Sequence, residues 1–120
     1  MQLISKLSLL LANNKNSAIL IGNYIDEFNN ASKSDKIKSI SKEPVIKTSK
    51  KSVYLSAMVE YLCIKNRLKI PTWVNKSRYF LKYPVFYSRF EQLKATLILE
   101  SPVPFRRRNL FISENGLMRI

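Results

Sequence analysis

Hydrophobic residues recur every three or four positions over the first half of this 120-residue chain, and that spacing predicts helices. The first stripe predicts an amphipathic helix near the N-terminus with these inward residues: Leu3, Ile4, Leu7, Leu10 and Leu11. After the polar turn "NNKN", a second helix is predicted to begin near Ser17 with these inward residues: Ile21, Tyr24, Ile25 and Phe28. Gly22 interrupts the second helix, and we expect it to mark the close approach of a neighbouring element.

A short helix and a long one are predicted next. In the short helix, Ser34 is the expected N-cap, Asp35 lies in the first turn, and Ile37 and Ile40 face inward. This helix should end before the proline that follows "SKE". The long helix is expected to be capped by Ser52 and to be central, because its apolar stripe is the most continuous of the chain: Leu55, Met58, Val59, Leu62 and Cys63.

Prolines and aromatic residues divide the second half into shorter pieces. Pro71 and Pro84 cut the stretch "KIPTWVNKSRYFLKYPVF", and no alternating strand pattern competes with the helical one. Helical spacing returns after a predicted cap at Ser88, with these inward residues: Phe90, Leu93, Leu97 and Ile98.

The stretch "SPVPFRRRNLFIS" predicts one more short helix and its exit. Ser101 can cap a helix that starts at Pro102, with Phe105 inward and Arg106–Arg108 in the last turn beside the negative end of the helix dipole. Asn109 suits a left-handed C-terminal cap, and "LFIS" should leave it extended. The whole pattern predicts an all-α fold, a compact single-domain bundle of about five to seven helices over residues 1–120.

Composition leaves few routes to catalysis. The chain has no histidine, one cysteine and two glycines, so it lacks the residues for a thiolate–imidazole pair, a typical zinc site or a glycine-rich phosphate loop. Cys63 is expected in the core, and Glu60, Glu91 and Glu100 are expected in surface or ion-paired roles rather than in a hydrolase or nuclease site. We therefore predict a non-enzymatic cytoplasmic protein without cofactor, metal or membrane span.

Positive charge gathers in the middle of the chain. The formal net charge is +13, and residues 61–90 contribute +7 without one acidic residue. Basic and aromatic side chains alternate there, which is typical of a surface that binds a nucleic-acid backbone and stacks on bases. The alternative is structural, because a segment of short helices needs aromatic residues to close its core and lysines to stay solvated.

The second half resembles a family of small, mostly uncharacterised bacterial helical proteins with a closing "ESP..FRRR..F" segment. The matching positions are Trp73, Phe80, Leu81, Pro84, Phe86, Leu93, Glu100, Ser101, Pro102, Phe105, Arg106, Arg107, Arg108 and Phe111. Genes of this family lie beside nucleotidyltransferase-like toxins, which implies an antitoxin or regulatory role through a protein partner. The first thirty residues are too short for the helix-turn-helix domain that several members carry, and Asn109 stands where glycine is common.

The three arginines are expected to have different roles. Neighbours on a helix point about 100° apart, so we predict that one arginine pairs internally, with Glu100 as the candidate, while another stays exposed beside Arg78 and Lys82. The alternative is that all three only cap the helix. The predicted surface for a protein partner, or alternatively for nucleic acid, comprises Arg78, Lys82, Arg106, Arg107, Arg108, Trp73 and Tyr83.

Overall fold

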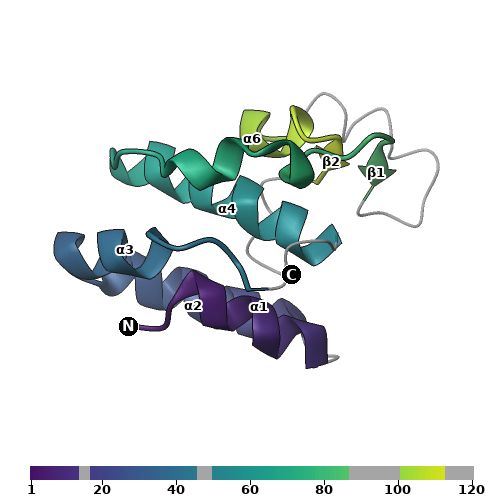
Figure 1. Ribbon diagram of the computed structural model, residues 1–120. Helices are drawn as coiled ribbons and strands as arrows, with labels where there is room; N and C mark the ends of the chain where they lie inside the picture. Colours follow the sequence, from purple (N-terminus) through teal and green to yellow (C-terminus); the bar gives the residue numbers. More distant parts are fainter. Residues whose placement is uncertain (14–16, 46–49, 87–100, 113–120) are drawn as a thin grey trace.

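Helix α4, Lys50–Asn66, runs through the middle of the molecule with other elements on both sides (Figure 1). The computed structural model describes residues 1–13, 17–45, 50–86 and 101–112. Every residue from 52 to 60 is buried, as a helix covered on two sides requires. The predicted stripe of α4 is confirmed, but the helix begins two residues before Ser52, which lies buried within it. None of the helices in the described ranges is long and apolar enough to cross a lipid bilayer.

Three helices form the layer on one side of α4: α1 (Ile4–Asn13), α2 (Ser17–Asn30) and α3 (Lys33–Ile40). The inward stripe predicted for α2 is confirmed in full. In α1 the residues Ile4 and Leu7 are buried together with Leu11, whereas Leu10 is 45% exposed, so its predicted inward position is wrong.

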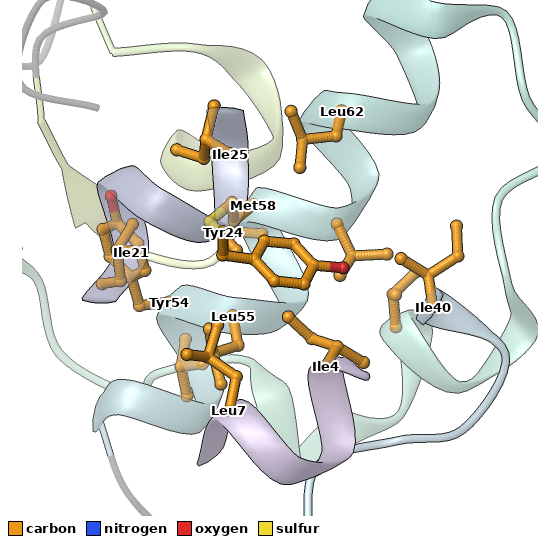
Figure 2. Packing of buried hydrophobic residues seen from close by; sticks show 14 of the residues in the cluster. Ile4, Leu7, Ile21, Tyr24, Ile25, Ile40, Tyr54, Leu55, Met58 and Leu62 are labelled. Atoms are coloured by element: carbon orange, nitrogen blue, oxygen red, sulfur yellow. The ribbon is translucent and has the colours of Figure 1, made fainter. Parts of the chain in front are cut away.

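Tyr24 joins this layer to the core and to α3. Figure 2 shows its ring at the centre of the packed residues, with the hydroxyl directed toward the side of Ile40. The hydroxyl of Tyr24 donates to Ser39 Oγ at 2.6 Å, because the Ser39 hydroxyl already donates to the Gln2 carbonyl at 2.7 Å. Burial raises the pKa of Tyr24, so it stays a hydrogen-bond donor.

Helix α3 differs from its prediction in its cap and its inward face. Ser32, not Ser34, is the N-cap, and its side chain accepts from the Asp35 amide. Ile40 is buried as expected, but Ile37 is 48% exposed. The helix packs only through its C-terminal end, where Ser39 and Ile40 are buried, and Ile37 is left at the surface.

The layer on the other side of α4 consists of short elements. Two turns of 3-10 helix, η1 (Thr72–Asn75) and η2 (Ser77–Tyr79), precede strand β1 (Val85–Phe86), and helix α6 (Val103–Arg106) precedes strand β2 (Leu110–Phe111). The strands form a two-residue parallel pair, so the chain is mostly helical but not all-α. The predicted helix over residues 88–98 lies outside the described residues.

The exit from α6 follows the sequence, but its entry does not. Asn109 has a φ of 64°, which confirms the left-handed cap and turns the chain into extended β2. Pro102 is the N-cap and makes no side-chain cap. Ser101 instead accepts a hydrogen bond from the Ile112 amide at 2.8 Å, so it ties the two ends of this segment together.

Gly22 provides a test of the packing of α2. A Cβ placed there meets nothing within 4 Å, so the predicted close approach is wrong. We expect Gly22→Ala to raise the free energy of unfolding by up to about 1 kcal/mol, because alanine loses less backbone freedom in a helix. Urea unfolding followed by circular dichroism measures the change, with Asn23→Ala on the same helix as a control that gains less. A loss of stability in Gly22→Ala would contradict the observed packing.

Candidate functional site

Arg108 lies inside the protein, although it follows two exposed arginines. Its side chain is fully buried, and Nη1 lies 2.9 Å from Glu60 Oε1 on α4. Nη1 and Nη2 also donate to the carbonyls of Pro104 and Val74, each at 2.7 Å. The guanidinium stacks over the ring of Phe80, 4.8 Å from its centroid. Arg108 therefore connects α4, α6, η1 and the end of η2.

This arrangement confirms that one of the three arginines pairs internally. The predicted partner Glu100 lies outside the described residues, and the observed partner is Glu60, whose side chain is 7% exposed. Burial lowers the pKa of Arg108, and the Glu60 carboxylate opposes that shift. Arginine remains charged over the working pH range, so the pair is a buried ion pair.

Arg107 and Arg106 both lie at the protein surface. Arg107 is partly exposed, with Nη1 3.5 Å from Glu60 Oε1 and Nη2 donating to Asn75 Oδ1. Its guanidinium also lies over the Phe80 ring. Arg106 is exposed. The same turn thus supplies one buried and two exposed arginines, because successive residues point about 100° apart.

Three of the four other predicted site residues, Arg78, Lys82 and Tyr83, are exposed, and Trp73 is buried. Lys82 is exposed and Tyr83 is 73% exposed, next to the arginines because the Leu81 amide donates to the Arg108 carbonyl. Trp73 is only 6% exposed, and its indole donates to the Ile40 carbonyl at 2.9 Å. Trp73 and Arg108 therefore do not lie at the surface beside the exposed basic residues. We call Lys82, Tyr83, Arg106 and Arg107 the arginine surface.

Arg78 is held by a different acid. Glu43 lies 3.0 Å from Lys76 Nζ and 3.9 Å from Arg78 Nη1, and it accepts from the Tyr79 hydroxyl at 3.2 Å. Burial and the neighbouring carboxylate raise the pKa of Tyr79. One carboxylate thus lies against two of the seven cations that the sequence places in residues 61–90.

The candidate catalytic groups of the sequence are in structural positions. Cys63 is fully buried, and burial raises the pKa of its thiol to about 11, which disfavours the reactive thiolate. Glu60 is engaged by two arginines. Within the described ranges, no group of three acidic, cysteine or histidine residues could hold a metal ion, and Glu91 and Glu100 lie outside them.

A surface cleft of about 580 Å³ lies between α3 and the chain that leaves α4. Figure 1 places α3 and that end of α4 at the same end of the molecule. The cleft combines aliphatic residues, Trp73, two hydroxyl side chains and three cations, and we call it the α3 cleft. Its lining residues are Lys33, Ile37, Ile40, Ser41, Arg67, Leu68, Lys69, Ile70, Pro71, Thr72 and Trp73. Its volume falls within the range of ligand-binding pockets.

The edge of the α3 cleft contains an unusual backbone position. Arg67 has a φ of 55°, in the left-handed region where glycine is usual. The Leu68 amide donates to the Cys63 carbonyl at 2.8 Å and the Arg67 amide to the Ile64 carbonyl at 3.4 Å, which closes the end of α4 as a Schellman turn. A side chain in this conformation costs about 1–2 kcal/mol. Arginine therefore stands where glycine would suit the fold better.

Comparisons with protein-family models, with curated proteins and with solved structures found no match. The family resemblance of the sequence accordingly stays a prediction.

Sequence reasoning missed the α3 cleft, although part of the signal was present. The run "CIKNRLKIP" must leave the helix before its proline, and it contains no glycine for the left-handed exit. One of its polar residues therefore had to take that conformation. The exposure of Ile37 had no comparable signal, because its spacing matches that of an inward residue.

The different positions of Arg107 and Arg108 can be tested by truncating each side chain. We expect Arg108→Ala to lower the free energy of unfolding by about 3–5 kcal/mol, because it leaves a buried carboxylate without its closest cation. Arg107→Ala should lower it by at most about 1 kcal/mol, since its ion pair is partly exposed to solvent. Urea unfolding of the two variants measures both losses, and equal losses would contradict the assigned positions.

Proposed function

We propose that this chain is a non-enzymatic cytoplasmic binding protein that acts by holding a protein partner, without cofactor or metal. The observation that carries this proposal is the α3 cleft, where Ile37 is 48% exposed beside further aliphatic residues. An aliphatic cleft gains most from apolar side chains that it takes out of water. A partner protein supplies such side chains, whereas a nucleic-acid backbone does not.

The family resemblance extends this proposal. It makes the chain the antitoxin-like or regulatory member of a bacterial two-gene module, with a nucleotidyltransferase-like toxin as the partner. The buried, protonated thiol of Cys63 and the paired carboxylate of Glu60 support a binding role, because both groups are occupied in maintaining the fold.

Nucleic-acid binding is the second candidate, and the arginine surface favours it. Lys82, Arg106 and Arg107 are exposed, as is the Tyr83 ring, and residues 61–90 contain no acid. Phosphate contacts release counterions, so this mode of binding weakens steeply with salt. Binding through apolar contacts in the α3 cleft depends far less on salt.

The two candidates can be separated with two variants and two salt concentrations. We expect Ile37→Ser to weaken binding to the product of the neighbouring gene by about tenfold, at both about 50 and about 200 mM salt. Because Ile37 is half exposed, the variant should fold normally, which circular dichroism checks. The matched control Lys82→Gln/Arg106→Gln should bind the partner as the unchanged protein does.

The reverse pattern would replace the proposal with its alternative. If Ile37→Ser binds the neighbouring product normally, the α3 cleft is not the partner site. If the chain binds a labelled oligonucleotide tightly, loses it at the higher salt concentration and loses it in Lys82→Gln/Arg106→Gln, nucleic-acid binding is the function.

A further inference from the structure

We infer that the α3 cleft receives an acidic, leucine-like amphipathic segment of a partner protein, and that Arg67 anchors one of its carboxylates. This inference rests on the proposed function and deepens it by naming the chemistry of the segment. The occupant follows from charge complementarity around an apolar floor.

Three cations line the α3 cleft. Lys33, Arg67 and Lys69 are exposed, and none of the three has an ion-pair partner in the part of the chain that the structure describes. None of the lining residues is acidic. By contrast, Glu43 lies against two cations and Glu60 against two more. Three exposed cations with no acid among the lining residues make the α3 cleft suited to an external anion.

Arg67 supplies a second, independent observation. Its positive φ is a conformation that glycine adopts without strain, and the Schellman turn at this position needs only the backbone. The turn therefore does not engage the guanidinium, which is exposed and available to an external carboxylate. Arginine binds carboxylate through two parallel hydrogen bonds, which fixes the register of a segment as well as attracting it.

The aliphatic residues that line the α3 cleft determine which other side chains the partner segment must carry. Ile37, Leu68 and Ile70 line the same cleft as the three cations, so a matching occupant combines aliphatic side chains with carboxylates. A helix with leucine on one side and glutamate flanking it has this pattern. A single fatty acid provides the apolar part but only one carboxylate for three cations.

Trp73 gives a direct readout, because it is the single tryptophan of the chain and lines the α3 cleft. The probe is a short synthetic peptide of leucine and glutamate, with leucines three and four positions apart. We expect it to change the tryptophan emission with saturation. Replacing all glutamates by glutamine, or all leucines by serine, should weaken binding at least about tenfold.

Arg67→Gly separates binding from folding. We expect this variant to bind the leucine–glutamate peptide about tenfold more weakly. Its melting temperature should rise by about 4 °C, because the left-handed strain is removed. Lys82→Glu is the matched charge control outside the α3 cleft, and it should bind the peptide within about twofold of the unchanged protein.

Several results would overturn the inference. They are no emission change with the peptide, equal binding of its glutamine version, unchanged binding in Arg67→Gly, an equal loss in Lys82→Glu, or saturable binding of decanoate without binding of the peptide.

The proposed function is tested separately by the neighbouring gene product. If Ile37→Ser weakens that complex but Arg67→Gly does not, the proposed function stands and the acidic segment is wrong. If Ile37→Ser leaves the complex unchanged, the proposed function fails first.

Discussion

The buried ion pair between Arg108 and Glu60 is the interaction on which the C-terminal layer depends. Glu60 is fixed by α4, and Arg108 reaches it while donating to the carbonyls of Pro104 and Val74. Segments separated by more than thirty residues thus share one guanidinium. Such a pair gives little net stability over apolar residues, but an arginine or a carboxylate left alone there would be very costly. The pair therefore favours one arrangement of the short elements over others.

The arginine surface and the α3 cleft both take their positions from α4. Because Arg108 points inward, the turn of α6 directs Arg106 and Arg107 to the protein surface. The left-handed Asn109 then aligns β2 beside β1, where the rings of Phe86 and Phe111 stack with centroids 4.9 Å apart. At the other end of α4, the left-handed Arg67 turns the chain back across α3 and forms the edge of the α3 cleft. Both proposed contact surfaces thus depend on α4. The arginine surface depends on the ion pair that Glu60 makes with Arg108, and the α3 cleft depends on the turn that ends α4.

The sequence predicted the elements that have a long periodic stripe. The stripes of α2 and α4 are buried as expected, because many residues must share one face and a single misfit does not change the result. Short elements have no such redundancy. A two-residue strand shows no alternation, and Ser101 could serve a helix start or a distant amide equally well by its chemistry. Glu60 was expected in a surface or ion-paired role, but its partner is 48 residues away, and spacing alone identifies no contact at that range.

A double-mutant cycle on Glu60→Leu and Arg108→Met tests the dependence of the fold on this pair most directly. Glu60→Leu leaves the buried Arg108 without its acid, and Arg108→Met leaves Glu60 with only the more distant Arg107. The double change replaces both charges with apolar side chains of similar length. We expect the double variant to lose less free energy of unfolding than either single variant, with a coupling energy of at least about 2 kcal/mol. Losses that simply add would show that the two side chains are buried independently, and they would contradict the dependence of the fold on this ion pair.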